Sequence, residues 1–319
     1  MSFVTGLASV TPQFMIPMVS ALVPPHRRAE AISIVFSGLM LGSLLPRFLS
    51  GVIAQFTVWR NIYWAALGLQ ALVFGLLWWF MPDYPAPASA ELRYFPALWS
   101  IVQLVTTQPV LAYARLMVFF SNAVFASYWT TLTALLSSTP YSYTPIQIGA
   151  FALIGIAPLI CVPFYSRFVI DRFVPNFSVM LGLLYAVCGV LVGTFTAELS
   201  IAGPIIQAIG VDFGVQTASV AYRAAIYSSI PEARNRTNVA YTVAAFIGQL
   251  SGTSIGNRLY AIGGWSKAGI FNIAFLAAAI AVTTLRGPWE TQWLGWRGGF
   301  NIRRRDVDHE LSVIEARQG

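Results

Sequence analysis

Ionisable side chains inside long apolar runs are the residues of this sequence with the clearest chemical potential. Arg47 and Asp212 each lie deep within such a run. An ionised side chain in the middle of a bilayer costs about 2.5 to 3.5 kcal/mol on insertion scales, so it is expected to face a cavity or a partner. Arg47, which follows Pro46, would contact an anion or a substrate in a central cavity, or else join two helices through an ion pair or a carbonyl bond.

Asp212 begins a polar stripe on one face of its predicted helix. Gln216, Ser219 and Arg223 follow at positions i+4, i+7 and i+11. A polar stripe on a membrane-spanning helix is expected to line water. Asp212 would bind a cationic group, take up a coupling proton, or neutralise Arg47.

A second stripe combines Arg115, Asn122, Trp129 and Thr133. Because the long side chain of Arg115 can reach the membrane interface, Asn122 and Trp129 are the predicted substrate contacts. Small residues form two further series with a spacing of four, which allows helix backbones to approach closely. They serve either static packing or sliding between two halves of the molecule, and their members are Gly38, Gly42 and Pro46 in one series and Gly248, Gly252 and Gly256 in the other.

These residues must be positioned by membrane-spanning elements. The chain has 319 residues, of which 57% are hydrophobic and 10% charged, whereas soluble domains carry about 25% charged residues. Nine apolar stretches have spanning length and no strand-like alternation, so they are predicted to be helices. They lie near residues 3–24, 32–56, 62–81, 113–137, 146–165, 174–196, 200–224, 238–260 and 266–286.

Composition and motifs also exclude several functions. The net charge of +7 is spread over the gaps between apolar runs, which argues against a nucleic-acid partner. Cys161 and Cys188 lie in apolar stretches, so neither a disulfide framework nor a metal site is expected. The sequence has no phosphate-binding loop of an ATPase, and the hydrolase-like pattern at residues 252–256 falls inside a predicted helix. We therefore expect no enzyme activity and no cofactor.

The basic residues of the connections predict the orientation. Arg27, Arg28, Arg93, Arg167, Arg172, Arg234, Arg236 and five arginines of the tail fall on one side, and Arg60, Arg258 and Lys267 fall on the other. The positive-inside rule makes the first side cytoplasmic, with the tail, in a multi-pass protein of the plasma membrane. On this side Arg167, Asp171 and Arg172, together with Arg28 and Arg234, are predicted to form a cytoplasmic gate between helix ends. We call these five the gate residues.

An internal repeat appears at an offset of 206 residues. It pairs Pro25 with Pro231, Arg28 with Arg234, Gly42 with Gly248, and Trp59 with Trp265. The paired helices share one orientation, which is typical of a parallel repeat about the membrane normal. The helices of residues 113–196 would then have an earlier copy that starts about 93 residues before Met1, so a twelve-helix architecture without its first three helices is expected.

Several segments resemble the major facilitator superfamily, with helices four to twelve present. Pro24-Pro25-His26-Arg27-Arg28 and the following Gly/Pro-rich helix resemble the fourth loop and fifth helix of that family, although Leu45-Pro46-Arg47 replaces its usual Gly-Pro-Gly-Gly core. Residues Arg167 to Phe173 resemble the second-half copy of its gate motif. The resemblance implies an incomplete N-terminal bundle at 1–81, a cytoplasmic linker at 82–112, a six-helix bundle at 113–286 and a cytoplasmic tail at 287–319.

The resemblance also implies a function. It predicts secondary active transport of a small organic solute, in the direction of efflux, by alternating access around a cavity with Arg47 and Asp212. The expected partners are the small-molecule substrate, the lipid bilayer and a coupling proton. The alternative is a truncated membrane protein that keeps part of a transporter fold and transports nothing.

Overall fold

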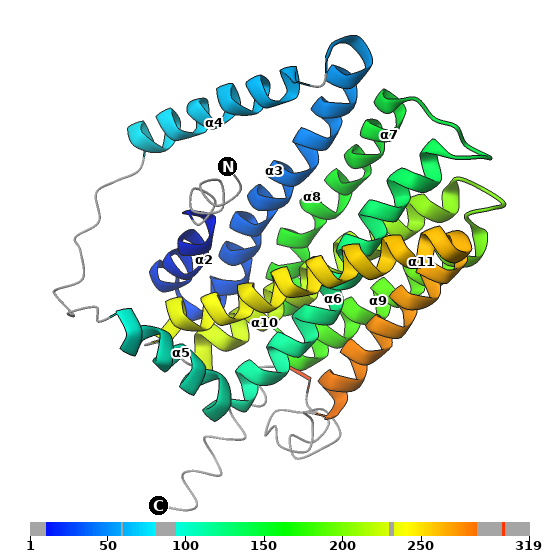
Figure 1. The fold of residues 1–319 in the computed structure, drawn as a ribbon. Coiled ribbons are helices and arrows are strands. Elements are labelled where there is room, and N and C mark those ends of the chain that lie inside the picture. The colour runs from blue at the N-terminus through cyan, green and yellow to red at the C-terminus, as the bar shows by residue number, and fades with distance from the viewer. Residues whose placement is uncertain (1–10, 59, 81–93, 230–232, 286–301, 304–319) are drawn as a thin grey trace, which may run out of the picture.

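The chain folds into a bundle of helices in the computed structural model, which describes residues 11–58, 60–80, 94–229, 233–285 and 302–303. The prediction of an all-α chain is confirmed for these residues (Figure 1). The α-helices are α2 (Thr11–Leu22), α3 (Arg28–Phe56), α4 (Asn61–Phe80), α5 (Tyr94–Thr107), α6 (Pro109–Ser137), α7 (Pro145–Phe151), α8 (Ile156–Tyr165), α9 (Pro175–Thr196), α10 (Ala202–Ser229) and α11 (Arg234–Leu285).

Six described helical segments are long and apolar enough to cross a membrane, namely α3, α4, α6, residues 145–170, α9 and α11. Helix α10 has 28 residues and is long enough as well, but it carries a polar stripe and is not among these six. Of the first predicted span, residues 11–22 are seen as α2, whereas residues 1–10 lie outside the described part of the chain.

Helix α11 contains two of the predicted spans. Its 52 residues are interrupted at Gly263 and Gly264, whose backbone angles are not helical. Gly264 has φ = 68°, in the left-handed region that glycine adopts without a steric penalty. The chain turns sharply here, so the arms of residues 234–262 and 265–285 are two helices (Figure 1).

The span predicted at 146–165 is one long segment of changing helical type. Helix α7 passes into a 3-10 turn (Ala152–Gly155), then into α8, and ends in a π-helical turn (Ser166–Ile170). Pro158 lies in the first turn of α8, and Pro163 lies further along it. A proline inside a helix removes one backbone donor, which agrees with the departures from regular α-helix in this segment.

The first part of the chain is packed loosely. Helix α4 has no buried residue and stands apart from the other helices (Figure 1). The region predicted as a linker, 82–112, contains α5 and the start of α6, while its residues 82–93 lie outside the described part. Most of the predicted tail, 287–319, lies outside it as well.

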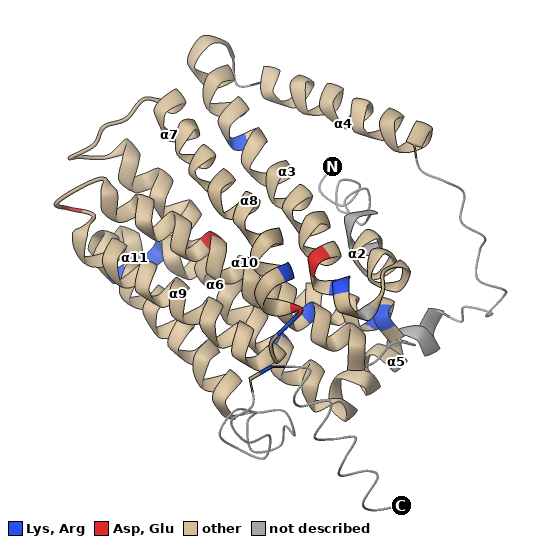
Figure 2. Cartoon of the chain, turned by 180° about the vertical axis from the view of Figure 1, so that it is seen from behind, with Lys and Arg blue, Asp and Glu red and all other residues tan. Residues whose placement is uncertain are grey.

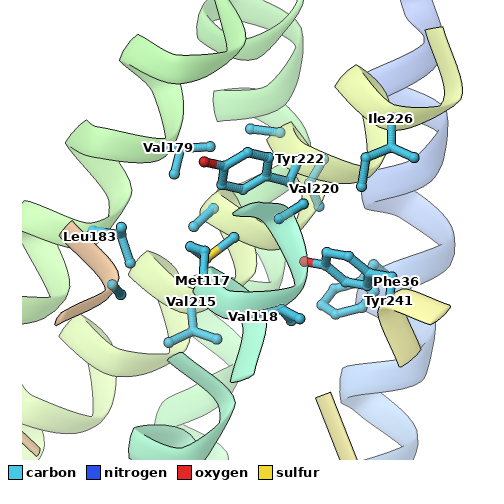
Figure 3. Packing of buried hydrophobic residues seen from close by; sticks show 14 of the residues in the cluster. Phe36, Met117, Val118, Val179, Leu183, Val215, Val220, Tyr222, Ile226 and Tyr241 are labelled. Carbon is cyan, nitrogen blue, oxygen red and sulfur yellow. The ribbon is translucent and has the colours of Figure 1, made fainter. Parts of the chain in front are cut away.

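The main core lies among α3, α6, α9, α10 and α11. Met117 and Val118 of α6, Val215 of α10, and Val179 and Leu183 of α9 belong to one cluster of buried side chains (Figure 3). Burying these apolar groups against one another leaves little space between the helices.

The two series of small residues have different surroundings. Gly248, Gly252 and Gly256 of α11 pack against Phe119, Ala123 and Ser127 of α6, where an added Cβ would overlap each partner. By contrast, an added Cβ on Gly38 or Gly42 of α3 would meet nothing within 4 Å. The first series therefore joins α6 to α11, and Gly38 and Gly42 have open space beside them.

Charged residues gather at one end of the bundle, near α2 and α5 (Figure 2). Helix α3 begins at this end with Arg28, which donates a hydrogen bond from Nη1 to Ser228 Oγ near the end of α10, at 3.0 Å. The backbone N–H of Val174 donates to the carbonyl oxygen of Ile302 over 3.0 Å, so the described piece of the tail lies near the start of α9. We call this the basic end.

Candidate functional site: a cavity between α6 and α11

A cavity of about 480 Å³ lies between α6 and the first arm of α11. Its walls are mostly apolar and aromatic, with a few hydroxyl and amide groups. The residues that line it are Arg47, Phe125, Ala126, Trp129, Thr130, Phe246, Gln249, Leu250, Thr253 and Ser254. Among them Arg47 alone comes from α3, so a single side chain brings a full charge to this cavity.

Arg47 is held by the aromatic wall. Its guanidinium carbon lies 4.7 Å from the centre of the Trp129 ring, a distance suited to a cation–π interaction. Its Nη1 atom is buried and has no hydrogen-bond partner in the described part of the chain. The side chain that carries this unpaired N–H donor is one of those that line the cavity.

Asp212 lies behind this wall and is 4% exposed. Trp129 donates its indole N–H to Asp212 Oδ1 at 3.0 Å. Arg47 and Asp212 attract each other electrostatically, yet no ion pair within 4.0 Å joins them among the residues that the structure describes. The two charges are therefore close enough to influence each other while both remain in contact with Trp129.

The other predicted substrate contacts lie elsewhere. Asn122 accepts a hydrogen bond at Oδ1 from Gln249 Nε2 at 3.1 Å and donates to the carbonyl oxygen of Val118 at 3.0 Å, and it does not line the cavity. Gln216 is 3% exposed, so the stripe of α10 is enclosed by protein at this position. Its Oε1 atom has no partner among the described residues.

Several lining residues could not be recognised from sequence. Gln249, Phe246 and Thr253 lie on the helix whose clearest pattern was the glycine series, and they carry no charge. Their common face becomes visible only once α11 is placed against α6. Ser254, which belongs to the hydrolase-like pattern, lies at the cavity within a helix and not at a strand-to-helix turn.

At the basic end Asp171 caps the start of α3. Its two carboxylate oxygens accept hydrogen bonds from the backbone N–H groups of Ala29 and Glu30, each at 3.1 Å. The first N–H groups of a helix have no partner within the helix, and the helix dipole favours negative charge there. Asp171, from the segment between α8 and α9, therefore joins that segment to α3.

The remaining gate residues have varied partners. Arg167 forms an ion pair with Glu30 of α3 at 3.6 Å, and Glu30 is an acid that the sequence pattern did not single out. Arg172 lies over the Phe168 ring at 5.4 Å. Arg28 donates from Nε to the carbonyl oxygen of Ser20 at 3.1 Å, and Arg234 donates to that of Tyr227 at 3.2 Å. These contacts connect α2, α3, α10 and α11 at the basic end.

Comparison with known proteins places this architecture in a family. The profile of the Major Facilitator Superfamily matches residues 1–252. The chain is 29% identical over 285 residues to "Uncharacterized transporter YgaY" of Escherichia coli O157:H7, which covers 89% of this chain and 70% of that protein. It is 26% identical over 287 residues to "Probable transporter SCO4007" of Streptomyces coelicolor, which covers 89% of this chain and 65% of that protein.

The match over most of the chain confirms the resemblance seen in the sequence, and it confirms that the chain is no enzyme, because the members of this family are transporters. The cavity and the helix contacts described above are therefore features of a multi-pass membrane protein. The chain belongs to the Major Facilitator Superfamily of membrane transporters.

Proposed function

We propose that the chain moves a small organic solute across a membrane by secondary active transport, in the direction of efflux. The observation that supports this function is the cavity of about 480 Å³ between α6 and α11, with Arg47 at its wall. Cavities of a few hundred Å³ with apolar walls and few polar groups are typical of small-molecule sites. Asp212 and Trp129 hold the charge of Arg47 in place.

The mechanism that we propose is alternating access. At the basic end, α3 is joined to the segment before α9 by the two hydrogen bonds of Asp171 and by the ion pair between Glu30 and Arg167. At the other end, α3 approaches α7 so closely that a Cβ on Gly51 would lie 2.6 Å from the carbonyl oxygen of Pro145. Breaking the polar contacts at the basic end while keeping the contact near Gly51 would open the passage on one side only.

We also propose the orientation and the number of spans. The basic end would face the cytoplasm of a cell whose plasma membrane holds the protein, because Arg28, Arg167, Arg172 and Arg234 gather there. Counting the two arms of α11 separately, nine helical segments would cross the membrane. They are the span predicted at residues 3–24, whose described part is α2, together with α3, α4, α6, residues 145–170, α9, α10 and the two arms of α11.

The test is a flux measurement on the purified chain in proteoliposomes under an imposed pH gradient. Carboxyfluorescein, choline and glucose supply an anionic, a cationic and a neutral probe. We expect saturable, protein-dependent flux of one of them, and a loss of that flux when a bulky side chain fills the cavity. Correctly folded protein that moves none of the three would contradict the proposal and would favour a membrane protein that keeps the fold without transport.

A further inference from the structure

Arg223 of α10 is a second buried cation, outside the cavity described above. It is 5% exposed and lies eleven residues beyond Asp212, which is about 16 Å along the helix towards the basic end. Aromatic rings from two other helices contact the guanidinium group of Arg223. Its guanidinium carbon is 4.5 Å from the centre of the Tyr241 ring and 5.7 Å from the centre of the Phe36 ring. Phe36 and Tyr241 reach this part of the core from α3 and α11 (Figure 3).

The hydrogen-bond partners of Arg223 are neutral. Its Nη1 donates to Asn238 Oδ1 and, at 3.4 Å, to Tyr227 Oη. Tyr227 in turn donates its hydroxyl to the same Asn238 oxygen at 2.7 Å. This arrangement fixes the position of the guanidinium group before any ligand arrives, so the side chain loses little conformational entropy when a ligand binds.

The charge of Arg223 has no counter-charge nearby. In the part of the chain that the structure describes, no carboxylate lies within 4.0 Å of it, and its Nε is buried without a hydrogen-bond partner. Asp212 is held by Trp129 and attracted by Arg47. A buried charge without a partner is costly, so a charged group inside the membrane is expected to face a partner or a ligand.

The balance of charge on the side chains inside the bundle favours an anion. Away from the helix ends, Arg47, Arg115 and Arg223 carry three positive charges, and Asp212 carries one negative charge. Gln216 and Ser219 lie between Asp212 and Arg223 on the same face of α10, and both are enclosed by protein, at 3% and 2% exposed. The Nε edge of a guanidinium fits the two oxygens of a carboxylate, and one unpaired cation neutralises one monoanion.

We propose that Arg223, positioned by Asn238 and Tyr227, is a binding subsite for the carboxylate of an organic anion, and that such an anion is the transported solute. The inference rests on the proposed transport function and narrows its substrate to one chemical class. Arg223 does not line the cavity near Arg47, so its subsite is a separate one that lies nearer the basic end.

The test compares two probes that differ in one charged group. Dansylglycine carries a carboxylate, dansylamide does not, and the binding of both to the purified protein is followed by dansyl fluorescence. We expect the wild-type protein to prefer dansylglycine, and Arg223→Gln to weaken its binding about tenfold, the effect of losing a charge-assisted hydrogen bond, with dansylamide unchanged. Arg223→Lys, which keeps the charge, should restore part of the preference.

Arg115→Gln is the matched control, because Arg115 lies at a similar distance from the basic end on α6 but outside the Arg223 group. A role of Arg223 in holding α10 to α11 would lower thermal stability without changing the preference between the probes. Equal binding of both probes by the wild type, or an unchanged preference in Arg223→Gln, would overturn the inference.

A second variant covers the case in which Arg223→Gln does not fold. Asn238→Asp places a carboxylate beside Arg223, so it should abolish the preference for dansylglycine while stability holds or rises. A preference that survives in Asn238→Asp overturns the subsite. The binding measurement does not depend on flux, so the two proposals can fail separately. The proposed transport function fails if wild-type proteoliposomes carry none of the flux probes, whatever the dansyl probes show.

Discussion

Trp129 and Asp212 connect the wall of the cavity to the helix behind it. The indole N–H of Trp129 on α6 donates to Asp212 Oδ1 on α10 at 3.0 Å, and the same ring lies under the Arg47 guanidinium at 4.7 Å. One aromatic side chain therefore touches both members of an oppositely charged pair. This contact orients the two charges on different helices without bringing them into a direct ion pair.

Replacing Trp129 by Phe tests this connection. Phenylalanine keeps an aromatic face for Arg47 but removes the donor to Asp212, and a hydrogen bond to a charged group contributes about 1.5 to 3 kcal/mol. We expect flux in proteoliposomes to fall about tenfold or more, since that free energy corresponds to such a factor. Trp99→Phe is the control, because Trp99 is exposed on α5. Equal flux in the two variants would contradict the role of the indole.

Replacing Asp212 by Asn removes the one acidic group held by Trp129. Asparagine has almost the same shape, so expression and thermal stability should hold, while transport or its dependence on pH should change because the group can no longer exchange a proton or attract Arg47. The measurement is flux as a function of pH, with Glu198→Gln, an exposed acid at the other end, as the control. A pH profile identical to wild type would remove Asp212 from the mechanism.

Replacing Asp171 by Asn should loosen the basic end. The charged cap on the first turn of α3 contributes about 1 to 2 kcal/mol, which corresponds to a shift of about five- to thirtyfold in the population of the open form. A reporter cysteine at Ser37, which is buried on α3, measures opening through its rate of labelling by a membrane-impermeant maleimide. Cys161 and Cys188 are exposed and are first replaced by serine.

Glu30→Gln is the matched variant for this experiment. It breaks only the ion pair with Arg167, whose side chain is 57% exposed, and such pairs contribute about 0 to 1 kcal/mol. The labelling rate of Glu30→Gln should therefore stay near that of wild type. If it rises as much as that of Asp171→Asn, the cap on α3 is not the dominant contact.

Two glycine-to-alanine variants separate the two series of small residues. A Cβ on Gly252 would overlap the carbonyl oxygen of Ala123, so Gly252→Ala should lower stability by about 1 to 3 kcal/mol. Gly42→Ala meets nothing within 4 Å and should raise stability by about 0.5 to 1 kcal/mol. Thermal unfolding in detergent gives the comparison. A stable Gly252→Ala protein would mean that α6 and α11 are less tightly packed than described.

Filling the cavity should block transport without unfolding the protein. Thr253 lines the cavity, and Thr253→Phe places a ring in a space of about 480 Å³. Ile255 is two residues further along α11 and 40% exposed, so Ile255→Phe changes the outer surface of the same helix. We expect a strong loss of flux in the first variant alone. Similar flux in both would show that the solute passes elsewhere.

Individual residues of the site were recognisable from sequence when their chemistry conflicted with their surroundings. Arg47 and Asp212 stood out because charges are rare in apolar runs, and the polar stripe of α10 followed from helical spacing alone. Trp129 was predicted as a substrate contact because it belongs to the second stripe, with Asn122, at helical spacing. The break at Gly263 and Gly264 lies between two predicted spans, where the chain has to reverse its direction.

Other features depend on which helices become neighbours, and a single sequence does not contain that information. Gln249 becomes a lining residue only because α11 faces α6, and Glu30 meets Arg167 across a separation of more than a hundred residues. Asn238 has no distinguishing pattern, yet it positions Arg223. The two glycine series share one spacing, and their different surroundings follow from the packing of α3 and α11.

The interlocked glycines of α11 affect how the solute would be released. Because Gly248, Gly252 and Gly256 fit directly against α6, we expect the two helices that form nine-tenths of the lining to move together. Arg47 lies on a different helix, so a shift of α3 against α6 and α11 would move the guanidinium charge away from the cavity. The cavity walls that remain would be uncharged. The part of the affinity that Arg47 contributes would then be lost in one step.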